Sequence, residues 1–228
     1  MRIQKYLSQK GVLSRREAEK YMKAGLVKLN GEVVRDLGRQ IDPEKDKIEI
    51  AEALKNEINK KITIAVNKPR GIVCDKNHDD SKTIFELLPE FKNLNTVGRL
   101  DKESEGLILL SNDGVVTRAV TGYDHKIEKE YEVQVRENIR PWHTKKLEEG
   151  IKLEDGVTLP AKAKLIGKNK FSLVLKEGRK HQIRRMADAL RLTIENLRRV
   201  RIGSINLKGI GVGKYRMLAK KEVESLKA

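Results

Sequence analysis

The feature that most constrains the fold is an apolar run, Leu107 to Leu110, bounded on both sides by turn residues. A short run of this kind is typical of a buried strand. Asp101 lies a few residues before it, in a turn that follows a Gly-Arg pair. A carboxylate beside a buried strand is costly unless it is paired or hydrogen-bonded. The pattern therefore predicts that Asp101 is either a local cap or a functional group at the mouth of a cleft.

The charge of the chain indicates a polyanionic partner. Its 228 residues include 49 Lys and Arg against 33 Asp and Glu, a formal net charge of +16. An excess of this size and sign favours nucleic acid, where neutralised phosphates release counterions. The alternative is a basic protein that is merely soluble. The length allows one or two domains with a real core.

Several kinds of site are excluded by what the sequence lacks. Cys74 is the single cysteine, so neither a disulfide framework nor a cysteine-based metal site can form. No metal-ligand spacing is found among the four histidines, His78, His125, His143 and His181. No apolar stretch approaches a membrane span and no signal-peptide pattern is found. We therefore expect a cytoplasmic protein without a metal site or membrane contact.

The first 50 residues predict a compact basic unit. Ser14 and Glu17 form a capping-box pattern, which predicts a helix that ends near Lys23. Three more elements are predicted: a short helix between Ile3 and Gly11, a hairpin over 26–34 that turns at Asn30-Gly31, and a strand over 47–50. Residues 51–61 are charged, lack strand alternation and are interpreted as a linker.

The rest of the chain predicts a second unit with many strands and few helices. Strands are expected at 62–66, 107–110, 130–135, 171–175, 197–202 and 204–207. Helices are expected at 83–88, 142–149, 181–190 and 222–226. We therefore predict an α+β fold in two domains, 1–60 and 61–228. The first is a small αβ RNA-binding domain, and the second a mixed, mostly antiparallel sheet with flanking helices and a central cleft.

The first two predicted helices offer cations for phosphate contacts, namely Arg2, Lys5, Lys10, Arg15, Arg16, Lys20 and Lys23. A solvated helix face is the usual role of such a charge run. The segment SRREAEKYMKAGLVKLNGEVV, however, resembles the small RNA-binding domain first known from the fourth small-subunit ribosomal protein. The resemblance covers Arg2 to about Ile50, and it implies RNA binding through the two helices.

Three segments of the second unit, taken together, resemble one enzyme family. They are GRLDKESEGLILLSNDG at 98–114, KEY at 129–131 and EGRKHQIRRM at 177–186. In this order and spacing they are similar to pseudouridine synthases of the ribosomal small-subunit type, the RsuA/RluB/RluE/RluF family. Members of this family also carry the amino-terminal domain described above. The resemblance implies isomerisation of a specific uridine in ribosomal RNA to pseudouridine, with no cofactor or metal.

The resemblance also assigns roles to single residues. Asp101 corresponds to the nucleophile, although a turn or helix-cap aspartate is the alternative. Tyr131 corresponds to an aromatic residue that faces the base, although a core tyrosine shows the same alternation. Arg184 corresponds to the arginine that pairs with the aspartate and keeps it ionised, and Arg185 is the rival for this role.

Further cations are expected to line an RNA path, namely Arg99, Lys102, Arg179, Lys180, Arg185, Arg198, Arg199 and Arg201. Leu207 is expected in the apolar wall around the base. The base must leave its stack to reach Asp101, and flipping costs least in a loop or bulge. The expected partner is therefore ribosomal RNA or a pre-ribosomal particle, bound by a monomer.

Two alternative functions remain open. A non-catalytic RNA-binding or ribosome-assembly factor explains the charge and the first unit but leaves Asp101 unexplained. A hydrolase that cleaves the glycosidic bond of a nucleotide in RNA usually needs a second carboxylate to activate water. The sequence offers no clear candidate for that second carboxylate.

Overall fold

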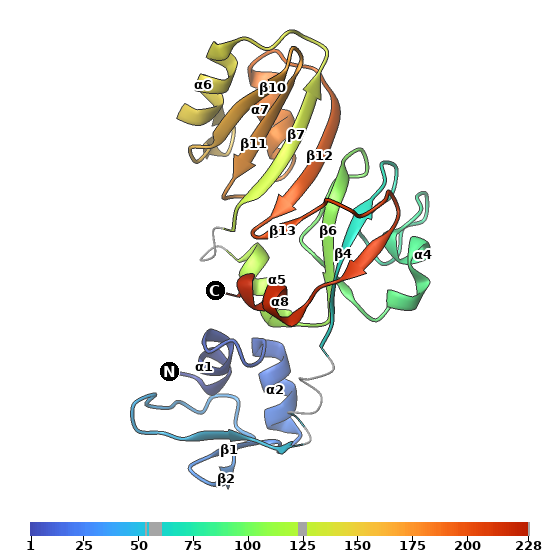
Figure 1. Cartoon of the computed structure of the whole chain (residues 1–228). Coiled ribbons are helices and arrows are strands. Elements are labelled where there is room, and N and C mark those ends of the chain that lie inside the picture. Colours follow the sequence, from blue (N-terminus) through green and yellow to red (C-terminus); the bar gives the residue numbers. More distant parts are fainter. Residues whose placement is uncertain (53, 55–60, 123–126, 228) are drawn as a thin grey trace.

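The computed structural model describes residues 1–52, 54, 61–122 and 127–227. Figure 1 shows a small amino-terminal unit at one end of an elongated molecule, followed by a long sheet with its helices. The sheet is mixed and mostly antiparallel. The predicted α+β fold class is therefore confirmed.

The amino-terminal unit packs two helices against three short strands. Its elements are α1 (Ile3–Gln9), α2 (Arg15–Lys23), β1 (Val27–Leu29), β2 (Glu32–Val33) and β3 (Ile48–Ile50). The predicted capping box forms, because Ser14 Oγ accepts from the Glu17 amide at 3.3 Å and Glu17 Oε2 accepts from the Ser14 amide at 2.7 Å. The hairpin turns at Asn30 and Gly31, both with positive φ. Most of the expected linker over 51–61 lies outside the described residues.

The second unit contains the remaining elements. Its strands are β4 (Thr63–Lys68), β5 (Asn95–Val97), β6 (Glu105–Ser111), β7 (Lys129–Val135), β8 (Lys152–Leu153), β9 (Gly156–Val157), β10 (Lys162–Gly167), β11 (Lys170–Leu175), β12 (Ile194–Ile202), β13 (Ile205–Asn206) and β14 (Tyr215–Met217). Its helices are α4 (Ile84–Leu87), the 3-10 helix η1 (Pro89–Phe91), α5 (Gly114–Thr121), α6 (Pro141–Glu149), α7 (Gln182–Ala189) and α8 (Lys220–Ser225). None of the described helices combines the length and apolarity needed to cross a membrane.

The long sheet is two half-sheets joined at one narrow seam. The strand order is β10-β11-β7-β12-β6-β4-β14, with β13 beside β12 and β5 beside β6. The seam is the pairing of β12 with β6. It is parallel, unlike the other pairings between the described strands, and it holds only the register pairs Arg198–Glu105 and Arg199–Gly106. We call the strands β10, β11, β7 and β12 the outer half-sheet, and β5, β6, β4 and β14 the inner half-sheet.

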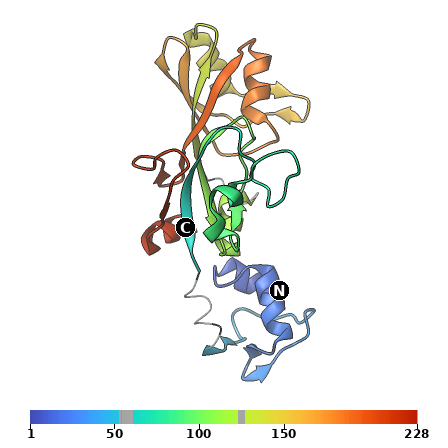
Figure 2. The same cartoon turned by 90° about the vertical axis from the view of Figure 1, so that its right-hand side faces the viewer.

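Alternation along β4 and β6 gives the inner half-sheet two separate cores. Ile64, Val66 and Ile108 belong to the pocket-side core, which α4 covers. Ala65 and Leu107 face the other way, into the rear core beneath α5 and α8. The outer half-sheet has one core, beneath α6 and α7. Figure 2 shows α7 (orange) and α8 (red) on opposite sides of the sheet.

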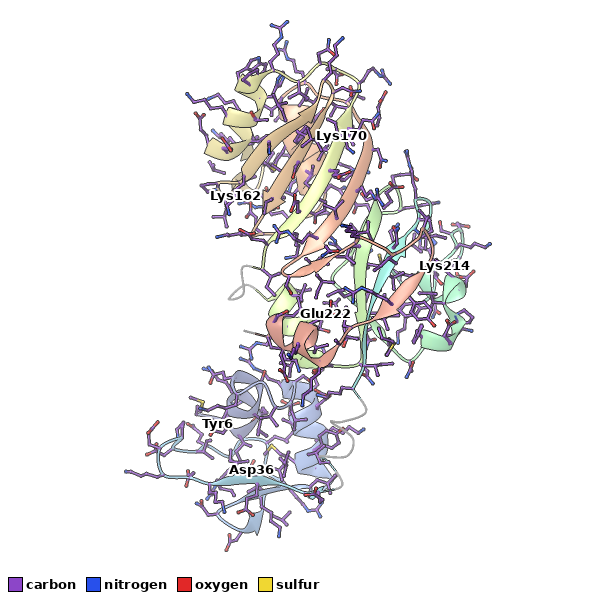
Figure 3. All side chains as sticks on the ribbon, in the orientation of Figure 1. Tyr6, Asp36, Lys162, Lys170, Lys214 and Glu222 are labelled. Atoms are coloured by element: carbon purple, nitrogen blue, oxygen red, sulfur yellow. The ribbon has the colours of Figure 1, made fainter. Side chains whose placement is uncertain are left out.

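The other face of the outer half-sheet carries ion pairs instead of a core. Lys162 lies 3.1 Å from Glu128, and Lys170 lies 2.8 Å from Glu132. Figure 3 shows both lysines on this face, which in that view is turned toward the reader. The pairs are partly exposed, so each contributes little to stability.

Strand β4 is longer than predicted, because two polar residues continue it. Asn67 and Lys68 are both buried, and the sequence pattern assigns them to a turn. Asn67 Nδ2 donates to the carbonyl of Ile210 at 2.8 Å, and Lys68 Nζ donates to the carbonyl of Ile72 at 2.7 Å. Buried polar groups with partners of this kind are tolerated inside a sheet.

Helix α5 was not predicted from the sequence. Asp113 caps it, since its carboxylate accepts from the Val115 amide at 3.0 Å. Asp113 is buried, and Lys227 Nζ lies 2.7 Å from it. Burial is the largest influence and raises the pKa of this carboxyl, but the bond to Lys227, the charges of Lys61 and Lys227 and the bond from the Val115 amide together leave the pKa below its usual range. The apolar residues of α5 follow closely on the apolar run of β6, so the sequence shows no separate helical periodicity for α5.

Polar contacts tie the amino-terminal unit to α5. Lys61 Nζ lies 3.2 Å from Glu17 on α2 and 3.2 Å from Asp113. Arg118 on α5 donates to Ser8 Oγ on α1 at 2.6 Å. These contacts fix the orientation of the helices α1 and α2 against the second unit.

Candidate active site

Asp101 lies in the loop that joins β5 to β6, at the seam between the half-sheets. Its carbonyl accepts from the Ser104 amide at 3.0 Å, which closes the turn. The neighbouring Leu100 is held by Cys74, whose thiol donates to the Leu100 carbonyl at 3.2 Å and accepts from the Leu100 amide at 3.3 Å. The side chain of Asp101 is 38% exposed. The loop therefore presents a carboxylate to solvent on a firmly held backbone.

Arg184 reaches this carboxylate from the outer half-sheet. It lies on α7, and its Nε is 3.8 Å from Asp101 Oδ2. Its Nη2 donates to the carbonyl of Glu103 at 3.0 Å and to Ser104 Oγ at 3.2 Å. The guanidinium thus binds the backbone of the Asp101 loop as well as facing its carboxylate. The two residues come from opposite sides of the seam, so the site exists only where the half-sheets meet.

Arg185, the rival to Arg184, has a different partner. Its guanidinium binds both carboxylate oxygens of Asp155, at 2.9 Å each. Arg179 also contacts Asp155, at 3.3 Å, and Glu177, at 3.1 Å. The bond to Arg185 is the main cause that lowers the pKa of Asp155 to about 2. Both arginines therefore hold the β8–β9 hairpin against the start of α7, and their donors are largely occupied.

A pocket of about 410 Å³ opens beside Asp101. Its apolar lining is Val73, Cys74 and Leu100, and its polar lining is Asp75, His78, Asp80, Ser81, Arg99, Asp101, Lys102 and His181. A volume of this size falls in the range of small-molecule sites, roughly 300–1,000 Å³. Arg99 and Lys102 are exposed on its rim, where Arg99 pairs with Asp75 at 3.1 Å and Lys102 donates to Ser81 at 2.8 Å.

Tyr131 lies at the same seam. It packs against the core of the outer half-sheet and also against the pocket-side core that contains Leu100. The guanidinium of Arg199 lies over its ring, 6.0 Å from the centroid. Tyr131 is half-buried and packs against the core that contains Leu100, and its role toward the base stays a prediction.

Arg199 does not line an RNA path, contrary to the prediction. Only 3% of it is exposed, because β12 points it inward at the seam. Its Nε donates to the carbonyl of Leu107 at 2.7 Å, and its Nη1 donates to the carbonyl of Arg99 at 3.4 Å. Arg199 therefore connects β12, β6 and the loop of Asp101. A run of three arginines separated by one valine gives no sign of which one is buried.

Leu207 does not border the pocket either. It is 5% exposed and packs in the rear core with Leu107 and Leu109. Leu100 belongs to the pocket-side core, on the other face of the inner half-sheet. The sequence offered no means of assigning Leu207 to a face, because it follows a strand of only two residues.

Most of the other predicted RNA contacts lie on the surface, whereas Arg201 is partly buried and pairs with Glu128 at 3.1 Å and Glu130 at 2.8 Å. Exposed cations of the amino-terminal unit are Arg2, Lys5, Arg15, Arg16 and Lys20, and Lys180, which precedes the pocket residue His181, is also exposed. His181 is a site residue that sequence reasoning missed, although it stands inside the 177–186 segment. Among the described residues, no group of three or more His, Cys, Asp or Glu side chains lies close enough to hold a metal ion.

Lys129, two residues before Tyr131 on β7, has a strongly lowered pKa. It lies between Leu175 and Ile202 on the neighbouring strands, and its Nζ donates to the carbonyl of Ile127 at 3.3 Å. Burial, and secondly the charge of Arg199, lowers the pKa of Lys129 from 10.5 to about 8. The unfolded chain therefore binds more protons between about pH 8 and 10.5, so stability rises with pH in that window.

We expect Lys129→Met to stabilise the protein at pH 7, by on the order of 1–2 kcal/mol after allowance for partial exposure. The physical reason is that the buried ammonium is penalised in full below pH 8. Urea unfolding of both proteins at pH 7 and pH 10 checks this. Other groups titrate equally in the two proteins, so the difference should shrink at pH 10. An equal difference at both pH values contradicts the assignment.

Comparisons with known proteins agree along the whole chain. Residues 62–189 match the family model of RNA pseudouridylate synthases, and residues 1–48 match that of the S4 domain. The chain is 37% identical to ribosomal large subunit pseudouridine synthase B of Bacillus subtilis, over 100% of this chain and 96% of that protein. It is 34% identical to ribosomal small subunit pseudouridine synthase A of Haemophilus influenzae, over 99% of each chain.

A solved structure agrees with this result. A crystal structure of a pseudouridylate synthase superimposes with a TM-score of 0.72 and 33% identity, over 99% of each chain. Sequence and fold thus agree over both units. The chain therefore belongs to the RNA pseudouridylate synthase family, as an isomerase of the RsuA/RluB/RluF type with an amino-terminal S4 RNA-binding domain.

Proposed function

We propose that this synthase converts a specific uridine of ribosomal RNA to pseudouridine, with Asp101 as the nucleophile. The observation that carries the proposal is the pairing of Asp101 with Arg184 at the edge of a nucleotide-sized pocket. The two relatives above are named as pseudouridine synthases of the large and of the small ribosomal subunit. That agreement supports ribosomal RNA as the substrate class.

The chemistry needs one carboxylate close to both the ribose and the base. The reaction breaks the bond from N1 of uracil to C1′, turns the base and forms a bond from C5 to C1′. The proton on C5 is lost and N1 gains one, so no electrons enter or leave. A carboxylate can add to the uracil ring or attack C1′ in such a step. Arg184 holds the loop of Asp101 and balances its charge, and Tyr131 supplies a ring on which the base can stack.

Binding of the RNA divides between the two units. The exposed cations on α1 and α2 supply affinity through phosphate contacts, without reading sequence. Arg99 and Lys102 line the pocket, and the exposed Lys180 precedes His181, which also lines it. In the proposed complex these three cations hold the phosphates that flank the flipped nucleotide. Flipping costs a few kcal/mol, and a loop or bulge reduces that cost. We therefore propose a target uridine in a loop or bulge.

The test is a map of pseudouridines in ribosomal RNA from cells with and without this protein, repeated with purified protein and unmodified RNA. We expect at least one uridine in a loop or bulge to be converted only where the protein is present. Free uracil is measured in the same reaction, because Asp75 and Asp80 place further carboxylates at the pocket. Release of uracil supports a hydrolase, and unchanged RNA supports a binding factor; either outcome overturns the proposal.

A further inference from the structure

A second donor approaches the carboxylate of Asp101 from the start of α7. The Nε2 of His181 lies 3.5 Å from Asp101 Oδ1, while the Nε of Arg184 lies 3.8 Å from Oδ2. The two side chains thus face different oxygens of one carboxylate. Both belong to the segment that opens α7, so one helix end presents two donors to a group on the opposite half-sheet.

The backbone of His181 adopts the left-handed conformation, with φ 49° and ψ 30°. Residues other than glycine adopt it rarely and at a cost, although histidine does so more often than most. His181 is also 51% exposed on its side chain and lines the pocket. Core packing therefore gives no reason for a histidine here in place of glycine. Strained residues of this kind are concentrated at functional sites.

We propose that His181 is a positioning residue for the carboxylate of Asp101, and this rests on the proposed role of Asp101 as nucleophile. In the complex with a uridine, its Nε2–H donates to Oδ1 while Arg184 restrains Oδ2, which fixes the plane of the carboxylate. An ionised carboxylate has about four acceptor sites, so each oxygen keeps a lone pair for the reaction. Both distances exceed those of hydrogen bonds. We expect both distances to shorten when a uridine fills the pocket, because catalytic hydrogen bonds are often long in the free enzyme and tighten in the substrate complex.

His181→Gly is the sharpest test, because glycine relieves the backbone strain while it removes the imidazole. We expect the single-turnover rate of pseudouridine formation to fall roughly tenfold or more. The Kd for RNA and the thermal midpoint should not fall. Imidazole added to the buffer should restore part of the rate, since the vacated space opens into the pocket. A purely structural role predicts neither the separation of rate from binding nor the rescue.

Arg191→Gly is the matched control. Arg191 follows the other end of α7, is exposed and has φ 58°, so the substitution relieves the same strain away from the site. The proposal is overturned if His181→Gly keeps the original rate, if Arg191→Gly loses as much, or if imidazole restores nothing. Asp101→Asn is measured in parallel. If it is active, the proposed function fails; if it is inactive while His181→Gly is fully active, only the role of His181 fails.

Discussion

Replacing Asp101 with Asn is expected to abolish pseudouridine formation, with a loss of at least about 10⁴-fold in the single-turnover rate. Asparagine has nearly the same shape but is neutral and offers no nucleophilic oxygen. The fold should not change, because the turn depends on the Asp101 carbonyl and Arg184 keeps its bonds to Glu103 and Ser104. RNA binding should stay the same or tighten slightly, because a negative charge leaves a basic surface. Single-turnover conversion and equilibrium binding, measured on the same RNA, check both expectations.

The matched control for this substitution is Asp188→Asn. Asp188 is an exposed carboxylate on α7, the helix that carries Arg184. Its replacement makes the same change of charge outside the pocket, so we expect conversion to continue at the original rate. Activity retained by Asp101→Asn would remove Asp101 from the chemistry, whatever the control shows. Loss of RNA binding together with activity would instead point to damage to the fold.

Gly106→Ala is expected to destabilise the protein by about 3–5 kcal/mol, through strain and overpacking together. Gly106 has φ +100°, and a Cβ there would clash with the carbonyl oxygen of Arg199 and stand 2.9 Å from its amide nitrogen. Both are backbone atoms of β12, so no side chain can move aside. Arg199 and Gly106 form one of the two register pairs of the seam. The substitution therefore pushes the half-sheets apart where Asp101 meets Arg184.

Urea unfolding measures this effect, with Gly209→Ala as the control. Gly209 has a similar φ of +80°, but a Cβ there meets nothing within 4 Å. We expect the control to lose only about 1–2 kcal/mol, the cost of the backbone conformation. We also expect Gly106→Ala to lose activity by more than its folded fraction explains. Equal losses of stability in the two variants would show that close approach at the seam is unimportant.

Local patterns were predictable from the sequence. The capping box at Ser14 and Glu17 and the turn at Asn30-Gly31 formed as expected, because their signals lie within four residues of each other. The buried strand was predictable for the same reason. The consecutive apolar residues Leu107 to Leu110 place side chains on both faces of a strand, so both faces must be shielded from water. Helix α5 was missed, because its apolar residues follow directly on that strand and an Asp-Gly pair reads as a turn.

The choice between Arg184 and Arg185 shows where sequence reasoning ends. The two are adjacent on α7, and helical periodicity left both available for Asp101. In the structure Arg184 faces Asp101 and Arg185 binds Asp155. These partners lie about 80 and 30 residues earlier in the chain, so no local pattern could distinguish the two arginines. The burial of Arg199 and the rear-core position of Leu207 were likewise invisible, because each depends on which face of a distant strand it meets.

The sequence by itself determined the family, the two units, the strand that bears the site and the candidate carboxylate, because these depend on neighbouring residues and on motif order. Only the tertiary structure decided how the site is assembled. A two-pair seam at Gly106 brings Asp101 and α7 together, buries Arg199 and places His181 and Arg184 beside the carboxylate of Asp101. The reason is physical: contacts between residues far apart in the chain follow from the packing of whole half-sheets, and no local pattern records that packing.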